Sequence, residues 1–305
     1  MAMGATRPMQ LLSKTLGPWD KGLDLSKPPS LLGARYLAGG QNLIWDAKPG
    51  ALMKRNGSRS LTTLPSGSTP RDSYVFVKAD GTSYVLASDG TNLYYATDPT
   101  LQTSWTLLKG SLNPDGFMEF ETAENRVWMT NGINVVMSWD GTTLVLHDRE
   151  QTVTAASAAT TANTIQNAAL TQADDYWNNQ KLIFTTGAFA GVTVTVSDFD
   201  AATDTITFTP ALSAPPAVGD DFMVGVNIPI GKLIRFWDGH LWIGSTSNNA
   251  SELRFHRLTN TVNGVAITID NPQAWPAAYQ LDINSNDGDR VWGLSPVLRD
   301  RFMVS

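Results

Sequence analysis

Short β-rich runs, in which most residues are apolar, recur along the chain, and many of them end at an Asp-Gly or Asn-Gly pair. Such runs span residues 75–81, 84–90, 126–132, 135–141 and 233–239. Asp-Gly and Asn-Gly pairs accept the positive φ angles of type I′ turns, so each run predicts a β-hairpin. Four-stranded units that repeat in this way are typical of a β-propeller. We therefore expect an all-β fold whose function depends on what is added to the propeller scaffold.

The same pattern divides the chain into four parts. Closely spaced prolines in residues 1–70 predict an extended N-terminal arm, and residues 71–148 predict the first propeller blades. Residues 149–229 begin with a run of small residues and continue with short β-rich runs, which predict a small inserted antiparallel β-domain. Residues 230–305 return to the blade pattern. The expected fold is therefore an interrupted β-propeller, since a chain tolerates a long insertion in a loop at little entropic cost.

The blade pattern predicts an incomplete propeller. The first two units span residues 74–108 and 117–147, a third spans residues 232–258, and a fourth begins near Tyr279. Roughly three and a half blades fall short of the four to eight that close a propeller. We favour the interpretation that polypeptide beyond residue 305 supplies the remaining blades, and the alternative is that another chain supplies them.

The inserted part contains its own strand signals. Residues 172–177 predict a short helical turn or the lead-in to a strand, and Asp198, Asp200 and Asp204 are expected in a turn between strands. The β-rich runs that predict strands are residues 181–184, 192–196, 205–208 and 222–226.

Composition excludes several classes of protein. The 305 residues are 42% hydrophobic, which is enough for a sizeable core, and only 16% charged, below the typical quarter. The chain has no cysteine, so a disulfide framework, a thiolate zinc site and a cysteine nucleophile are excluded. No apolar run approaches the roughly 20 residues of a membrane span, and residues 1–15 lack the apolar core of a secretory signal. We expect synthesis in the cytoplasm without export by the main route.

Charge is distributed unevenly along the chain. Residues 1–70 carry a balance of +6, whereas residues 71–150 and 151–230 carry −6 each, and the whole chain carries −6. The acidic body argues against broad, sequence-independent DNA binding, which requires neutralisation of phosphates. We interpret the basic arm first as a solvated segment, with docking on an acidic partner or nucleic acid as the alternative. The candidate docking residues are Trp19, Lys21, Arg35, Lys54 and Arg55.

Candidate catalytic and metal-binding residues do not form recognisable motifs. His147, His240 and His256 are far apart and have no neighbour at ligand spacing, and His240 follows a hairpin turn. No Gly-x-Ser-x-Gly elbow, phosphate-binding Gly-rich loop or His-Glu-x-x-His motif occurs. The pairs 174–175 and 220–221 offer carboxylates to calcium, but they do not follow the order of a calcium loop, so turn-forming roles are favoured. We expect no enzyme activity, no cofactor and no metal site.

Two further groups of residues keep a carbohydrate-related alternative open. Residues 94–105 resemble a degenerate Asp-box, the structural turn of sialidase-like propellers. A glycosidase usually needs two placed carboxylates, and Glu119, Glu121 and Glu124 are close together in the sequence. Glu119 and Glu121 alternate along one predicted strand face, however, which we expect to be solvated. Blade tryptophans could stack on sugar rings, although packing between blades is the favoured interpretation. These tryptophans are Trp105, Trp128, Trp139, Trp237, Trp242 and Trp292.

Several segments resemble phage tail proteins. Residues 16–24 and 28–33 are similar to the start of many such proteins, and residues 41–46 and 50–58 resemble the usual continuation, with Asn56 where a proline is usual. In the inserted part, the segments that resemble a module recurrent in tailed-phage virion proteins are residues 170–177, 187–191, 196–205 and 214–220. Residues 236–245 resemble the propeller strands of short-tail nozzle proteins.

The family that the chain resembles is the short-tailed phage tail nozzle (tail tubular protein B-like) β-propeller family. The resemblance implies a structural virion protein of the tail that forms a homo-oligomeric ring, a hexamer in the family, around the DNA exit channel. It also implies docking on the tail adaptor and other tail proteins, and passage of viral DNA without specific binding. A receptor- or carbohydrate-binding propeller is the leading alternative, and a sialidase-like glycosidase is the third.

Overall fold

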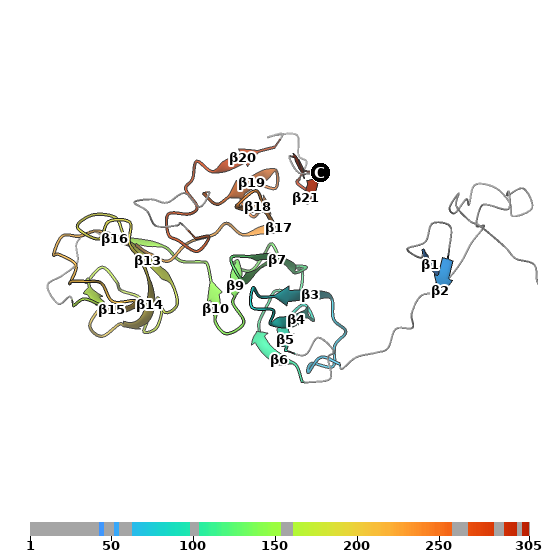
Figure 1. Cartoon of the computed structure of the whole chain (residues 1–305), viewed down its shortest axis with the longest axis horizontal. Helices are drawn as coiled ribbons and strands as arrows, with labels where there is room; N and C mark the ends of the chain where they lie inside the picture. The colour runs from blue at the N-terminus through green and yellow to red at the C-terminus, as the bar shows by residue number, and fades with distance from the viewer. Residues whose placement is uncertain are drawn as a thin grey trace, which may run out of the picture. The chain divides into compact units, whose positions relative to one another are not determined.

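The computed structural model describes residues 43–45, 52–54, 63–97, 104–153, 161–257, 268–283, 290–297 and 301–304 (Figure 1). All paired strands among these residues are antiparallel, and none of these residues lies in a helix, so the all-β prediction is confirmed. No helix in this part of the chain is therefore available to cross a membrane. The chain divides into two units, residues 1–60 and 61–305. In the first unit, β1 (Leu43–Trp45) pairs with β2 (Leu52–Lys54).

Three four-stranded sheets in the second unit each follow a simple up-and-down order, as propeller blades do. We call them the first, second and third blade-like sheets. The first contains β3 (Asp72–Val77), β4 (Ser83–Ser88), β5 (Leu93–Ala96) and β6 (Thr106–Lys109). The second contains β7 (Glu119–Ala123), β8 (Arg126–Thr130), β9 (Met137–Trp139) and β10 (Leu144–Leu146). The third contains β17 (Gly231–Trp237), β18 (His240–Thr246), β19 (Glu252–Phe255) and β20 (Gln280–Asp282).

The third blade-like sheet corrects the sequence-based division of the blades. The segment near Tyr279 was expected to begin a fourth unit, but β20 pairs with β19 through Arg254 and Gln280 and completes the third sheet. The prediction was wrong because the connection between β19 and β20 is long, and sequence spacing assigned the strand to its nearer neighbour. The strands β21 (Leu294–Val297) and β22 (Arg301–Val304) then form a separate two-stranded sheet.

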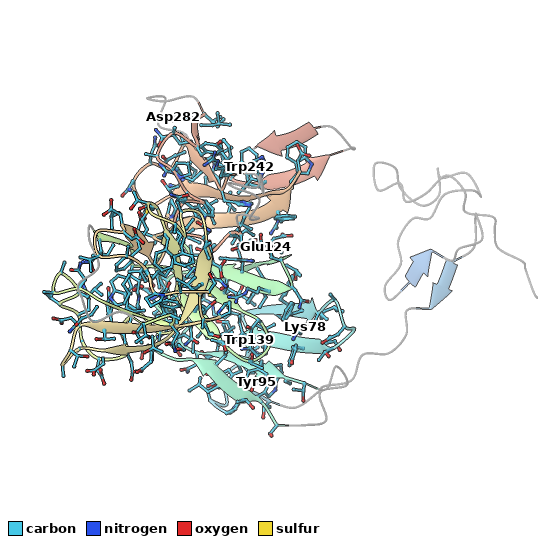
Figure 2. The ribbon with its side chains drawn as sticks, turned by 60° about the vertical axis from the view of Figure 1, so that its left-hand side comes forward. Lys78, Tyr95, Glu124, Trp139, Trp242 and Asp282 are labelled. Atoms are coloured by element: carbon cyan, nitrogen blue, oxygen red, sulfur yellow. The ribbon has the colours of Figure 1, made fainter. Side chains whose placement is uncertain are left out.

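The first strands of the blade-like sheets lie side by side, which is the arrangement that relates blades around a propeller axis. Strand β7 lies beside both β3 and β17, and β17 lies beside β21. Apolar side chains fill the space between successive sheets: one buried cluster joins the first and second sheets, another joins the second and third, and a third joins the third sheet to β21. Trp139 belongs to the first of these clusters (Figure 2). The fold is therefore propeller-like.

A six-stranded sheet separates the second and third blade-like sheets in the sequence. Its strands are β11 (Gln151–Val153), β12 (Thr164–Gln166), β13 (Lys181–Phe184), β14 (Thr193–Asp200), β15 (Thr205–Thr209) and β16 (Phe222–Val224). The order is β11-β16-β13-β14-β15-β12. The four expected runs all form strands, whereas β11 and β12 were not predicted, because each contains a single apolar residue. Residues 174–179 form turns, neither helix nor strand, and place Trp177 in the core of this sheet.

The turns at the Asp-Gly and Asn-Gly pairs join strands as predicted, but most of them differ from the expected type I′ geometry. Only Asp238-Gly239, of the predicted pairs, has both φ angles positive, at 49° and 76°. At Asp80, Asp89 and Asp140 only the following glycine has positive φ, and the aspartate carboxylate accepts hydrogen bonds from the backbone two residues onward. The Asp-Gly signal therefore predicts these hairpins through side-chain capping, which is a second property of aspartate in turns.

Candidate functional site

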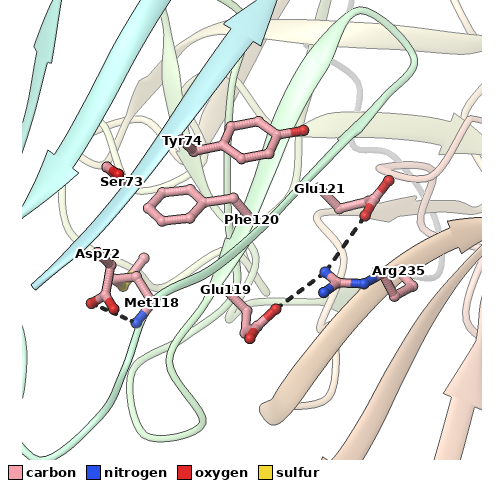
Figure 3. Close-up of a pocket in the computed structure, with 8 residues that line it drawn as sticks. All are labelled: Asp72, Ser73, Tyr74, Met118, Glu119, Phe120, Glu121 and Arg235. Carbon is pink, nitrogen blue, oxygen red and sulfur yellow. Dashed lines mark hydrogen bonds and ion pairs between the residues drawn. The ribbon is translucent and has the colours of Figure 1, made fainter. Parts of the chain in front are cut away.

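A cleft of about 400 Å³ lies where the first strands of the three blade-like sheets approach one another (Figure 3). Strand β3 and strand β7, with the residue before it, contribute most of its wall, and β17 contributes one arginine. The lining residues are Asp72, Ser73, Tyr74, Met118, Glu119, Phe120, Glu121 and Arg235. Because these strands come from different sheets, the cleft exists only when the sheets are packed together.

Arg235 ties the second and third blade-like sheets together in this cleft. Its Nη1 lies 3.1 Å from Oε2 of Glu119 and 3.7 Å from Oε2 of Glu121, and it also donates to the carbonyl of Ile234 at 2.8 Å. Burial raises the pKa of the Glu121 carboxyl, and the nearby Arg235 guanidinium opposes that increase. The sequence-based expectation that Glu119 and Glu121 form one solvated face was wrong, because alternate residues of β7 point toward β17 and are half-buried there.

The opposite wall of the cleft is fixed by hydrogen bonds and ring stacking. The Asp72 carboxylate accepts the backbone N–H of Met118 at 3.1 Å. The rings of Tyr74 and Phe120 stack with centroids 5.4 Å apart and planes 9° apart. The Tyr74 hydroxyl also contacts the Thr122 hydroxyl at 2.8 Å. These contacts fix the side chains on this side of the cleft, so this wall is rigid.

The charge of this cleft is negative, because three carboxylates face one guanidinium. Such a surface repels phosphate groups, and Arg235 is already engaged by Glu119 and Glu121. The lining offers the Ser73 and Tyr74 hydroxyls and its three carboxylates as candidate nucleophiles, and no histidine lies in the lining to activate the hydroxyls. The two glutamates are ion-paired with Arg235, so the lining is a fixed surface of net negative charge.

A buried hydrogen bond joins a serine of the second blade-like sheet to the histidine that directly follows this sheet. Nε2 of His147 lies 2.8 Å from Oγ of Ser138, and the imidazole stacks on Trp128 with ring centroids 4.9 Å apart. Both Ser138 and His147 are buried, and burial lowers the pKa of His147 to about 4. Nδ1 of His147 has no hydrogen-bond partner among the described residues. The pair is therefore a neutral packing contact without the orienting carboxylate or the access to substrate that a nucleophile needs.

The other two histidines stabilise the second hairpin of the third blade-like sheet. Nδ1 of His256 accepts the backbone N–H of Leu241 at 2.6 Å, and Nδ1 of His240 contacts the carbonyl of His256 at 2.6 Å. Burial lowers the pKa of His256 to about 4, with a further contribution from His240. His240, expected to have a structural or surface role, is half-buried at this contact.

A polar cluster at the tip of the β7–β8 hairpin was missed by sequence reasoning. The Glu124 carboxylate accepts the backbone N–H of Ile269 at 3.0 Å, and burial raises the pKa of Glu124 to about 7 (Figure 2). Arg126 Nη1 lies 3.8 Å from Asp270 and its Nη2 lies 3.9 Å from Asp140. Glu124 and Ile269 are 145 residues apart, so no local signal joins them.

The paired aspartates of the six-stranded sheet act in turns. The Asp174 carboxylate accepts the N–H of Ala201 at 3.2 Å, and the Asp220 carboxylate accepts the N–H of Ala217 at 2.8 Å. Asp198 and Asp200, expected in the turn between strands, lie in β14, and only Asp204 lies in the turn itself. Asp200, the last residue of β14, accepts the N–H of Ala202 at 2.8 Å. Within the described residues, no group of three or more histidine, cysteine, aspartate or glutamate side chains could hold a metal ion.

The blade tryptophans divide between core and surface. Trp128, Trp139 and Trp242 are buried between sheets, as expected. Trp292 is 70% exposed, so its expected place in the core was wrong. It lies after the third sheet and before β21, where the guanidinium of Arg290 covers its ring at 4.8 Å from the centroid.

The candidate docking residues of the arm fall almost entirely outside the described residues. Trp19, Lys21, Arg35 and Arg55 lie outside them, and Lys54 ends strand β2. Their docking role stays a prediction. No protein-family model, no curated protein and no solved structure matches this chain. The resemblance to tail nozzle proteins thus rests on the residues of the sequence.

Proposed function

We propose that this chain is a structural subunit of a short-tailed phage tail nozzle, made in the host cytoplasm and located in the tail of the virion. In this role it forms a homo-oligomeric ring, a hexamer by family resemblance, around the DNA exit channel and docks on the tail adaptor. The propeller-like fold and the tail-protein segments of the sequence support the proposal.

The observation that carries the proposal is the rigid acidic wall along the first strands. The wall has a net negative charge, because it contains three carboxylates, of Asp72, Glu119 and Glu121, and one guanidinium, of Arg235. Hydrogen bonds and ion pairs fix these side chains. A surface beside moving DNA must not bind phosphate, because each neutralised phosphate would hold the strand in place. A fixed negative wall meets that requirement, whereas a catalytic cleft would need an activated nucleophile or paired carboxylates free of arginine.

The oligomeric state of the full chain tests the proposal directly. We expect closed rings in negative-stain images of the purified protein and a matching mass by light scattering at micromolar concentration. A monomer that binds glycans on an array would favour the receptor- or carbohydrate-binding alternative and contradict the nozzle assignment. Release of reducing sugar from a polysaccharide would favour the glycosidase alternative instead.

The charge of the acidic wall supplies a second test. The double variant Glu119→Gln/Glu121→Gln leaves Arg235 without its ion pairs, so non-specific binding of duplex DNA should rise at low salt and disappear as salt is added. Fluorescence anisotropy measures that binding. The matched control Asp115→Asn/Asp282→Asn changes net charge equally at exposed positions and should leave DNA binding near that of the unmodified chain. Equal binding by both double variants would show that only net charge matters and would remove this support.

A further inference from the structure

A second cleft, of about 530 Å³, lies between the six-stranded sheet and the third blade-like sheet. Glu150, just before β11, and Asn227, just after β16, line one side of the cleft. Arg254 of β19 and Arg257, two residues after β19, line the other side. Trp275 and Pro276, from the connection that leads to β20, complete the wall. The volume is in the range of clefts that hold small ligands.

The two arginines make this cleft basic in a chain that is acidic overall. Arg254 is held in place, because its Nη1 donates to Oε1 of Gln280 at 2.7 Å and lies 3.6 Å from Oε1 of Glu252. The guanidinium of Arg257 has no hydrogen-bond or ion-pair partner among the described residues, while its backbone N–H is fixed to the carbonyl of Ala274 at 2.7 Å. The backbone of Arg257 is therefore fixed, and its guanidinium can donate two parallel N–H hydrogen bonds. This geometry matches the two oxygens of a carboxylate.

The remaining wall combines fixed apolar surface with hydrogen-bonding groups. Trp275 is 9% exposed and belongs to the apolar cluster between the second and third blade-like sheets, so only a small part of its indole is open to the cleft. Its Nε1 donates to the carbonyl of Ile269 at 3.0 Å, and Pro276 lies next to it in the sequence. Asn227 and Gln273 add amide groups, and Glu150 is the single carboxylate of the lining. Burial raises the pKa of Glu150, so its negative charge opposes an anion less than that of an ordinary glutamate. Apolar ring edges beside amides and a carboxyl are the surroundings that a sugar ring with its hydroxyl groups requires.

We propose that this cleft binds an acidic sugar residue, with its carboxylate at Arg257 and its ring against Pro276 and the small exposed part of Trp275. Asn227, Gln273 and Glu150 are within the same lining and supply partners for the hydroxyl groups. A neutral sugar would offer no anion to the Arg257 guanidinium, and a free phosphate would offer no apolar surface to Pro276. The site goes beyond the proposed nozzle function and does not depend on ring formation.

Binding of defined oligosaccharides to the full chain tests the site. We expect a galacturonic acid trisaccharide to bind in isothermal titration calorimetry, and the neutral galactose trisaccharide to bind about tenfold more weakly or worse, since a hydrogen bond to a charged group is worth about 1.5–3 kcal/mol. Inorganic phosphate and acetate serve as separate probes. Binding of either small anion as tightly as the acidic trisaccharide would overturn the proposal, because it would identify a site for small anions only.

Matched variants locate the binding. Arg257→Ala should weaken binding of the acidic trisaccharide about tenfold or more, and Arg257→Lys should retain part of it, because the charge remains while the fork is lost. Arg290→Ala removes an exposed arginine beside another tryptophan and should leave binding unchanged. Asn227→Ala, at an exposed position, provides a second probe of the cleft if Arg257→Ala does not fold. The proposal would be overturned if Arg257→Ala bound the acidic trisaccharide as tightly as the unmodified chain. If Arg257→Ala does not fold, unchanged binding by Asn227→Ala would overturn it. Ring images from the same preparations report the nozzle function independently.

Discussion

One carboxyl group and two buried histidines in this protein have pKa values that folding shifts in opposite directions. Burial raises the pKa of Glu124 to about 7 and lowers the pKa values of His147 and His256 to about 4. A carboxyl whose pKa is raised on folding stabilises the fold below its ordinary pKa, and that contribution is lost as pH rises through the folded value. A histidine whose pKa is lowered stabilises the fold above its ordinary pKa, and that contribution is lost as pH falls.

Glu124→Gln isolates the carboxyl contribution. The amide oxygen still accepts the backbone N–H of Ile269, but it cannot ionise beside Asp270. The difference in thermal midpoint between variant and unmodified chain should therefore move in favour of the variant as pH rises from the ordinary value of 4.5 to above 7. Thermal unfolding followed by circular dichroism across this range measures it, and the histidine contributions cancel in the difference. Asp115→Asn, at an exposed position, should show no such trend, and a flat difference for Glu124→Gln would contradict the assignment.

Ser138→Ala tests the buried partner of His147. Removal of the hydroxyl leaves Nε2 of a buried imidazole without its 2.8 Å contact, and a buried polar group without a partner costs about 1–3 kcal/mol. Urea unfolding should show a loss of that size with an unchanged dependence on denaturant. A second substitution, His147→Leu in the Ser138→Ala background, removes the unsatisfied group, and we expect it to recover part of the loss. Equal stability of Ser138→Ala and the unmodified chain would contradict this account.

At the scale of the element, packing between sheets depends on a few aromatic side chains. Trp139 on β9 lies with its ring 4.6 Å from Tyr95, 4.9 Å from Tyr84 and 6.2 Å from Phe76, centroid to centroid. Trp139→Ala removes these contacts and leaves a cavity between the first and second blade-like sheets, so it should cost roughly 3–5 kcal/mol of unfolding free energy. Chemical denaturation measures the loss.

Trp292→Ala is the matched control for that prediction. The same side chain is removed where it is 70% exposed, so the change should lie within about 0.5 kcal/mol. If both variants lost similar stability, the distinction between core and surface tryptophans would be wrong.

Local turn chemistry made most of the blade strands predictable, because the Asp-Gly and Asn-Gly pairs coincide with hairpins of the blade-like sheets. The tight turn between β7 and β8 was not predictable in this way. It is formed by Glu124 and Asn125 at φ angles of 50° and 58°, and although Asn accepts such an angle readily, Glu rarely does. Asn125 also accepts the backbone N–H of Ala79 at 2.7 Å, so a contact with another sheet helps to fix its conformation.

The candidate sites were less predictable than the strands because they are built from distant segments. Arg235 meets Glu119 from 116 residues away, and a single strand pattern reports only that Glu119 alternates with apolar residues. The basic cleft likewise combines Asn227, from the connection between β16 and β17, with Arg257 and Trp275, from the connection between β19 and β20. Sequence pattern gives the face on which a residue lies, whereas the packing of sheets decides which faces meet.

At the scale of the whole molecule, the six-stranded sheet has the architecture of a separable insertion. Its apolar core contains residues from Val153 to Val224 alone, whereas Val226 and Ile228 belong to the cluster between the second and third blade-like sheets. Asp148 and Asn227 form a β-bridge, so the chain leaves and re-enters the propeller-like part at one place. The sequence-based boundaries at residues 149 and 229 stay predictions, and this geometry shows how to test them.

Replacement of residues 150–225 by an Asn-Gly pair should leave the blade-like sheets folded. The bridge already holds the two ends at the spacing that a two-residue hairpin turn closes. The variant loses the hydrogen bonds from Gln180 to the carbonyl of Leu146 and from Asn271 to Thr193, so we expect a lower thermal midpoint with cooperative unfolding retained.

Near-ultraviolet circular dichroism and limited proteolysis measure the outcome of this excision. The tryptophan signal of the blade-like sheets should persist, because Trp128, Trp139 and Trp242 pack outside the excised core. Residues 149–227 expressed alone provide the complementary measurement and should also unfold cooperatively around their own apolar core. Loss of cooperative unfolding in both pieces would show that the two parts fold only together. In that case the six-stranded sheet would be an integral part of the propeller-like body, and the interruption seen in the sequence would not mark a domain boundary.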